Sequence, residues 1–410
     1  MLNSLQRDVK LIVFSRGVRA FAFSYLNIVF AIYLNRIGYT TVVIGIIHSV
    51  AYISGALLTA VWGYTSDRIG RKNVLTLLAI LTILSNTILI LSTNLAFILL
   101  AVVIINVGAG GSAGGGQGGG TFNPVEHALL AEKCSAEKRN QIFAITSFVG
   151  SVLGSLGALM SGLPQYLEEA WAWNTVNSYK PLFGLTCLLS FTLVFIYRAI
   201  HEEHRPQVKQ QVFTKQSRGF VTKMSLLGFL DNMGAGMISP LFSYWFFLRF
   251  GVELKALGIL FSISYLFAAA SFLIAPMIAR IIGVVRTMVF SHATASLIYL
   301  FIPFVPTFFI AGVMMVFRSL VAYMDNPLRE SFTMAMVKSE ERGSAAGVTN
   351  LARVVPFGVS PTLSGYMMQN LSLNMPLVIG GSFQLVHDFI FYYVFRHVRP
   401  PEEEKRRGSG

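Results

Sequence analysis

Long apolar segments, one after another along the chain, restrict its fold more than any other feature of the sequence. A helix of about 20 apolar residues crosses a bilayer. Only helices and closed barrels satisfy the backbone in lipid, and the apolar runs here are continuous rather than alternating, which argues against a barrel. The sequence therefore predicts an all-α membrane protein with twelve spans, at residues 11–34, 42–63, 73–92, 96–131, 140–162, 181–198, 220–247, 255–280, 285–304, 307–336, 343–368 and 375–396.

Composition and charge support this class. Charged residues make up 12% of the chain and hydrophobic residues 54%, whereas soluble domains carry about 25% charged residues. The net charge of +13 needs no nucleic-acid partner, because most Lys and Arg residues fall in alternate loops, as the positive-inside rule expects of cytoplasmic loops. We therefore expect a multi-pass protein of the cell membrane with both termini in the cytoplasm.

Weak internal symmetry indicates that the spans form two halves. Three glycines recur 213 positions later, and the pair Pro124 and Arg139 recurs 203 positions later as Pro327 and Arg342. The recurring glycines are Gly38, Gly45 and Gly70, matched by Gly251, Gly258 and Gly283. The sequence predicts six-helix halves at residues 1–200 and 219–400, joined by a basic cytoplasmic linker at 201–218 and followed by a cytoplasmic tail at 401–410.

A glycine-rich stretch at residues 108–120 occupies the place where the first half is longer. Three interpretations stay open: an unwound segment in a protein-lined place, a helix whose small face permits close packing, and an engineered linker. A phosphate-binding loop is disfavoured because no Gly-Lys-Ser/Thr follows.

The stretch "GYTSDRIGRKN" at residues 63–73 resembles the signature between helices two and three of the major facilitator superfamily. With twelve spans in two halves, it makes the chain similar to that family over nearly its whole length. The chain also shows a general resemblance to efflux-type bacterial and archaeal members. The resemblance implies a transporter fold in which this loop latches the inner side. The residues to which it assigns gating are Gly63, Asp67, Arg68, Gly70, Arg71, Glu132 and Arg139.

Charges inside the spans are candidate functional residues, because each costs several kcal/mol in the bilayer core. Arg16 and Arg19 lie one turn apart on one helix face, where two guanidiniums can bind a carboxylate or phosphate. The alternative is that both side chains snorkel to the interface. Arg353 is a further cation expected to line the cavity.

Asp231, with its neighbour Asn232, lies in the first span of the second half. Such a carboxylate can load and release a proton, and the alternative is a fixed salt bridge to a cation of helix one. Asp325, Arg329 and Glu330 lie on predicted span ten, and Glu126 is the repeat counterpart of Arg329. These charges fit a gate between the halves, and they equally fit ion pairs within one helix.

We therefore predict a secondary transporter that moves a small organic solute by alternating access, as proton-coupled efflux. An organic-anion uniporter or exchanger, and a non-transporting receptor or lipid scramblase, stay open as alternatives. The residues provide no enzyme signature, so we expect no cofactor or metal, and the proton gradient is the expected energy source. A small-molecule substrate and membrane lipids are the expected partners of a monomer.

Overall fold

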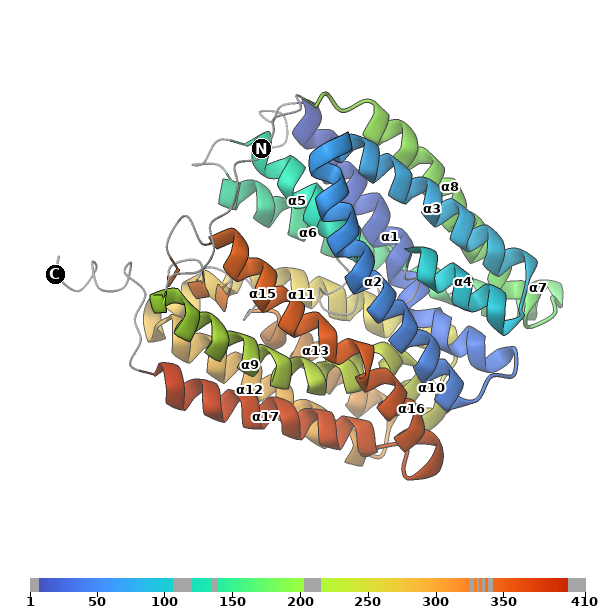
Figure 1. The fold of residues 1–410 in the computed structure, drawn as a ribbon. Coiled ribbons are helices and arrows are strands. Elements are labelled where there is room, and N and C mark those ends of the chain that lie inside the picture. The colour runs from blue at the N-terminus through green and yellow to red at the C-terminus, as the bar shows by residue number, and fades with distance from the viewer. Residues whose placement is uncertain are drawn as a thin grey trace. The chain divides into compact units, whose positions relative to one another are not determined.

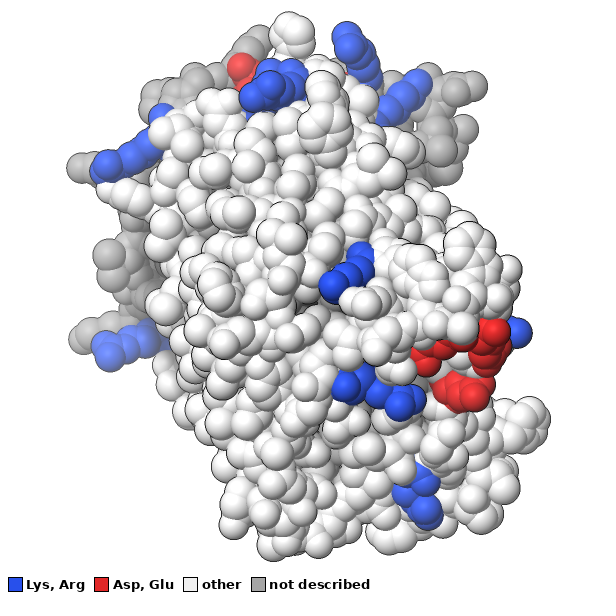
Figure 2. All heavy atoms as spheres, turned by 90° about the vertical axis from the view of Figure 1, so that its right-hand side faces the viewer, with Lys and Arg blue, Asp and Glu red and all other residues white. Residues whose placement is uncertain are grey.

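The computed structural model describes residues 7–105, 120–134, 139–202, 215–324, 328–329, 332–333, 336–337 and 342–396. These residues form helices joined by short turns and loops, without a β-strand among them. Within these residues, eight helices are long and apolar enough to cross a membrane, and Leu95–Ile105 and Phe308–Ala322 are shorter apolar helices. Uncharged side chains cover most of the face drawn in Figure 2. The all-α membrane class predicted from the apolar runs is therefore confirmed.

Contacts divide the chain into two units. Unit 1 comprises Met1–Gln207 and Ser239–Leu266, and unit 2 comprises Val208–Ile238 and Phe267–Gly410. The helices of unit 1 are α1 (Arg7–Arg36), α2 (Thr41–Ile69), α3 (Arg71–Leu91), α4 (Leu95–Ile105), α5 (Phe122–Glu132), α6 (Arg139–Leu159), α7 (Leu163–Trp171), α8 (Lys180–Arg198) and α10 (Phe242–Phe250). Those of unit 2 are α9 (Lys215–Ile238), α12 (Val284–Phe301), α13 (Phe308–Ala322), α15 (Arg342–Val354), α16 (Ser360–Asn370) and α17 (Met375–Phe395). Helix α11 (Leu254–Ile282) begins in unit 1 and ends in unit 2.

Small residues let the helices of unit 1 approach closely. Helix α1 packs along α6, where a Cβ on Gly157 would lie only 2.7 Å from the Cα atom of Phe21. Helices α3 and α8 also lie side by side (Figure 1). This packing buries Leu26, Val29 and Phe30 of α1 completely, so the polar residues of the same helix also lie in the interior.

The repeated glycines have a structural cause. Gly70 ends α2 with φ 94°, and its repeat counterpart Gly283 ends α11 with φ 92°. Side chains other than hydrogen are strained at such φ angles, which glycine adopts freely. The pattern seen in the sequence therefore marks equivalent turns in the two parts of the chain.

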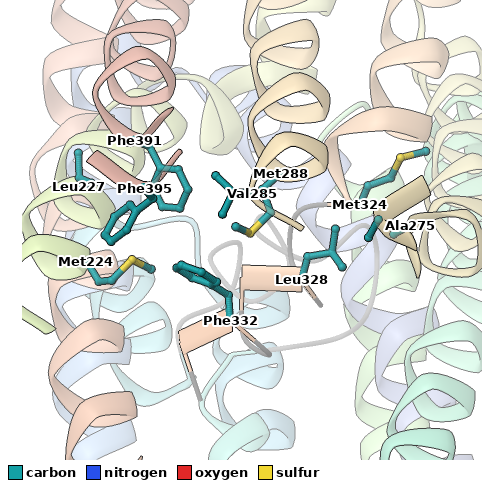
Figure 3. Packing of buried hydrophobic residues seen from close by; sticks show 11 residues of the cluster. Met224, Leu227, Ala275, Val285, Met288, Met324, Leu328, Phe332, Phe391 and Phe395 are labelled. Atoms are coloured by element: carbon teal, nitrogen blue, oxygen red, sulfur yellow. The ribbon is translucent and has the colours of Figure 1, made fainter. Parts of the chain in front are cut away.

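Unit 2 has a cluster of buried apolar side chains. Helix α17 packs against both α9 and α12, and Figure 3 shows the cluster that these helices share with the segment after α13. The cluster consists of Met224, Leu227, Ala275, Ala279, Val285, Met288, Met324, Leu328, Phe332, Phe391 and Phe395. Helices α9 and α17 meet at two glycines, since a Cβ on Gly380 would lie 2.7 Å from the carbonyl oxygen of Gly234.

Some predicted spans are not single helices. The span predicted at residues 220–247 consists of α9, a 3-10 turn at Ser239–Leu241 and α10, and Pro240 in this turn lacks the N–H that a continuous helix requires. Pro356 lies in a similar break, Val355–Gly358, between α15 and α16. In the span predicted at residues 96–131 the structure describes α4 and α5, and most of the glycine-rich stretch lies outside the described residues.

Candidate functional site

Unit 2 holds a chain of buried charged and polar side chains that links four segments. Asp231 comes from α9, His292 from α12, His387 and Asp388 from α17, and Arg329 from the segment after α13. Between 1% and 8% of Asp231, His387, Asp388 and Arg329 is exposed. Buried charges are costly unless they are paired and hydrogen-bonded, so the contacts among these groups define their charge states.

His292 lies between two carboxylates. Its Nδ1 atom is 2.7 Å from Asp388 Oδ1, and its Nε2 atom is 3.3 Å from Asp231 Oδ1. A neutral imidazole has one donor nitrogen, and only the protonated ring donates from both. This position therefore fits a histidinium that neutralises part of the charge of two aspartates.

His387 extends the chain towards a cation. Arg329 Nη1 lies 3.3 Å from His387 Nε2, and His387 Nδ1 lies 3.0 Å from Asp388 Oδ1. Arginine is a donor only, so Nε2 of His387 is the acceptor and Nδ1 carries the hydrogen that is donated to Asp388. The ring is therefore neutral, and the described network contains two cations, Arg329 and His292, with two carboxylates.

Close helix packing brings these groups together. Helices α9 and α17 approach at Gly234 and Gly380, one turn from Asp231 and Gln384 respectively. The Gln384 side-chain amide then lies 3.4 Å from Asp231 Oδ1. Asn232 is directed elsewhere, because its amide donates to the carbonyl oxygen of Gly228 in its own helix at 2.7 Å.

The same donor atoms also resemble a set of metal ligands. One ligand atom from each of Asp231, His292 and His387 lies within 4.8 Å of the others, and transition metals favour such nitrogen and oxygen donors. However, the Arg329 guanidinium lies against His387 Nε2, and a second cation there would be repelled. We therefore interpret the group as a hydrogen-bonded charge network.

Unit 1 holds a second buried charge cluster, between α1 and α5. Arg19 Nη2 donates to Glu126 Oε2, and Arg16 Nη1 donates to Asn123 Oδ1. Arg16 Nη1 also lies 3.6 Å from Glu126 Oε1, and the Arg19 guanidinium lies 4.5 Å from the centre of the Phe122 ring. The exposed fraction is 2% for Arg16, 1% for Arg19 and 0% for Glu126, so neither arginine snorkels to the surface.

The signature loop forms a third group, at the junction of α2 and α3. Arg71 is buried, forms an ion pair with Glu132 and donates to the carbonyl oxygen of Ala128 at 3.2 Å. The carboxylate of Glu202 accepts the backbone N–H groups of Arg71 and Lys72 at 2.7 and 2.9 Å. Because Gly70, the N-cap residue of α3, has no side chain to cap the helix, Glu202 supplies the cap from a distant part of the chain.

The other candidate residues have few described contacts or lie outside the described residues. Arg68 lies over the Tyr64 ring with its guanidinium 4.3 Å from the ring centre, and a Cβ on Gly63 would meet no atom within 4 Å. The Cγ atom of Arg353 would lie 3.2 Å from a Cβ on Gly228. Asp325 and Glu330 lie outside the described residues, as do the side chains of Asp67 and Arg139.

The sequence reasoning missed His292, His387 and Asp388. A signal was present, because the span at 375–396 contains the dipeptide His387–Asp388 and an ionisable residue within a span is a functional candidate by default. His292 in the span at 285–304 carries the same signal. Which carboxylate each histidine binds depends on the rotation of three helices about their axes, and the sequence does not contain that information.

Comparison with known proteins agrees with the fold and identifies the family. The family model described as the Major Facilitator Superfamily matches residues 12–223 and again residues 224–410. An uncharacterized membrane protein of Saccharomyces cerevisiae is 24% identical over 426 residues, covering 95% of this chain and 94% of the yeast protein.

Solved transporter structures share the fold at low sequence identity. A POT family peptide transporter has a TM-score of 0.75 at 9% identity and covers 96% of this chain and 98% of its own. The xylose transporter XylE from E. coli has a TM-score of 0.73 at 13% identity, covering 93% and 95%. The nucleoside transporter NupG has a TM-score of 0.70 at 16% identity, covering 96% and 100%. The chain therefore belongs to the major facilitator superfamily, and it is a secondary transporter of a solute rather than an enzyme.

Proposed function

We propose that this transporter couples movement of its solute to protons and that Asp231 is the group that binds the proton. The observation that carries the proposal is the position of His292 between the carboxylates of Asp231 and Asp388. Chains of acidic and histidine side chains inside membrane segments serve proton transfer in many pumps and transporters. The network in unit 2 has this composition.

The balance of charges explains why a proton matters there. Among the described residues, two carboxylates face one histidinium and one guanidinium, so the charges of these four groups balance when Asp231 is ionised. A proton on Asp231 removes the charge that attracts His292 and leaves Asp388 as the described carboxylate that pairs with His292. Binding and release of one proton therefore switch the link between α9 and α12, which is a local change that a rocking transporter can use.

Export is the direction that we propose, from the resemblance of the sequence to efflux-type members of the family. The aromatic run of α10 gives this direction no further support. Trp245 and Phe246 are fully buried. Within unit 1, Trp245 stacks on Phe242 and Phe246 meets Phe242 edge to face, so these rings serve packing. Direction is read from the sign of proton movement in the experiment below.

We further propose that the α2–α3 loop is the inner gate, with Arg71 as its central residue. Its ion pair with Glu132 joins the start of α3 to the end of α5, and Glu202 holds the same turn through two backbone N–H groups.

We also propose that the transporter is a monomer in the cell membrane, with both termini in the cytoplasm.

The experiment that tests the coupling uses purified protein in liposomes with an internal pH dye and an imposed pH gradient. Anionic and cationic amphiphilic compounds are added in turn, and solute-dependent proton movement is recorded. We expect Asp231→Asn to abolish proton movement while exchange of labelled solute for unlabelled solute persists, because exchange needs no net proton transfer. Glu169→Gln, which changes an exposed carboxylate bonded by Gln165, is the matched control and keeps both activities. Unchanged proton flux in Asp231→Asn would show that another group binds the proton.

A further inference from the structure

We propose that Arg16 and Arg19 bind the carboxylate group of an organic monoanion and that this monocarboxylate is the transported solute. The role of the bound molecule as solute rests on the transport function proposed above. The binding itself is inferred from unit 1 alone, and the proton network of unit 2 is not part of the argument.

The described side chains of the cluster carry more positive than negative charge. Among the described residues, the two guanidiniums of Arg16 and Arg19 pair with one carboxylate, that of Glu126. All three side chains are at least 97% buried, and a buried charge without a counter-ion is strongly unfavourable. The cluster therefore has one positive charge more than its own carboxylate balances.

The two arginines also have hydrogen-bond donors that are buried without an acceptor among the described residues. Arg19 Nε, Arg19 Nη1 and Arg16 Nε are buried and have no acceptor among the described residues. Buried donors are nearly always paired in native structures. Each of these donors therefore either binds a ligand or lowers the stability of the fold, because a buried donor without an acceptor loses its hydrogen bonds to water. These three donor nitrogens, on two neighbouring guanidiniums, are suited to the two oxygens of one carboxylate, which can accept about four hydrogen bonds.

The charge count also selects the class of anion. One carboxylate neutralises the excess charge completely, whereas a phosphate monoester carries about −1.5 to −2 at pH 7 and would overcompensate it. A cationic solute would add to the excess. The cluster therefore favours a monocarboxylate over both an organic phosphate and an amine.

Glu126 and Phe122 hold the arginines ready for such a ligand. Glu126 engages one terminal nitrogen of each arginine, and the Phe122 ring lies against the Arg19 guanidinium. An aromatic ring on one face of the guanidinium is itself attractive and leaves the in-plane donors Nε and Nη1 for the ligand. The pair is therefore positioned before the solute arrives, which lowers the ordering cost of binding.

The experiment measures ligand binding by the full-length protein in detergent, without a pH gradient. Thermal unfolding is followed in sodium acetate, lactate, hexanoate and benzoate, with phenyl phosphate and benzylamine as differently charged relatives of benzoate. A ligand that binds only the folded state raises its stability in a saturable way. We expect at least one of these monocarboxylates to do so and neither phenyl phosphate nor benzylamine to do so. Failure of all four monocarboxylates overturns the proposal.

Variants of the arginines locate the site. Arg19→Gln is expected to weaken monocarboxylate binding about tenfold or more, since hydrogen bonds to charged groups are among the stronger ones. Arg19→Lys keeps the positive charge but not the fixed fork of N–H donors. Its affinity for the monocarboxylate should lie between that of Arg19→Gln and that of the natural protein. Arg36→Gln, on the same helix but exposed, is the matched control and keeps full affinity. Equal affinity in Arg19→Gln and Arg36→Gln places the bound anion elsewhere and refutes the assignment.

A variant that gains a new ligand preference separates loss of the binding site from poor folding. Glu126→Gln leaves two uncompensated positive charges, so the cluster should then prefer the more highly charged phenyl phosphate to benzoate. If this variant folds and keeps the natural preference for benzoate, the charge count does not set the ligand class. If Glu126→Gln does not fold, the comparison of Arg19→Lys with Arg36→Gln decides the question.

The outcome is separable from that of proton coupling. Asp231→Asn should keep its stabilisation by a monocarboxylate, because the measurement involves no proton flux. Absence of monocarboxylate binding together with lost proton flux in Asp231→Asn would overturn only the solute class. Binding that persists together with unchanged proton flux in Asp231→Asn would overturn only the proton carrier.

Discussion

The contact between α9 and α17 provides a strict test of how packing supports the proton network. Replacing Gly380 with alanine adds a Cβ that would lie 2.7 Å from the carbonyl oxygen of Gly234 and 2.8 Å from Cγ1 of Ile238. Ordinary contacts of this kind begin at 3.4 Å, so the shortfall against the backbone oxygen is 0.7 Å. Because that oxygen belongs to a helix backbone, the two helices must separate by a similar amount.

The separation has two expected consequences. Overpacking of this size costs about 1–3 kcal/mol of unfolding free energy, and the higher helix propensity of alanine offsets up to about 1 kcal/mol of it. The Gln384 amide, now 3.4 Å from Asp231 Oδ1, would also move beyond hydrogen-bonding distance. Gly380→Ala should therefore lower both thermal stability and proton-coupled transport.

Gly184→Ala in α8 is the matched control, because a Cβ at that position would meet no atom within 4 Å. It gains the same helix propensity without overpacking, so the difference between the two variants isolates the contact at Gly380. Unfolding midpoints in detergent and proton flux in liposomes are the two measurements. Equal midpoints for Gly380→Ala and Gly184→Ala, with normal flux in both, would refute the close packing of α9 against α17.

Three further predictions concern charges. Glu202→Ala should destabilise the protein by about 1–2 kcal/mol, because the N-terminus of α3 loses its acceptor, and thermal unfolding against Glu169→Gln measures this loss. Arg329→Gln removes one cation from the network, so both of its described carboxylates bind protons more readily. The pH profile of proton-coupled transport should therefore move to higher pH. A shift to lower pH would contradict the charge count. Arg71→Gln should free the end of α5 and speed maleimide labelling of Cys134, and an unchanged labelling rate would argue against the gate.

The sequence by itself determined the class, the family and most of the helices. Hydropathy is a local property, because any run of about 20 apolar residues is driven into the bilayer whatever its neighbours are. The signature at residues 63–73 is equally local, and it was sufficient to indicate the family. Gly70 and Gly283 were visible as a repeat because their turns need the same φ angle in both places.

Only the tertiary structure decided which charges meet. Arg19 and Glu126 are 107 positions apart, and His292 and Asp388 are 96 apart. Such pairs depend on how far each helix is rotated and shifted against its neighbour, and glycine contacts such as Gly234 with Gly380 set that geometry. The sequence showed that Arg16, Arg19 and Asp231 needed partners, because lipid does not solvate charge. The packing of helices determined that the partners are Glu126 for the arginines and His292 for the aspartate.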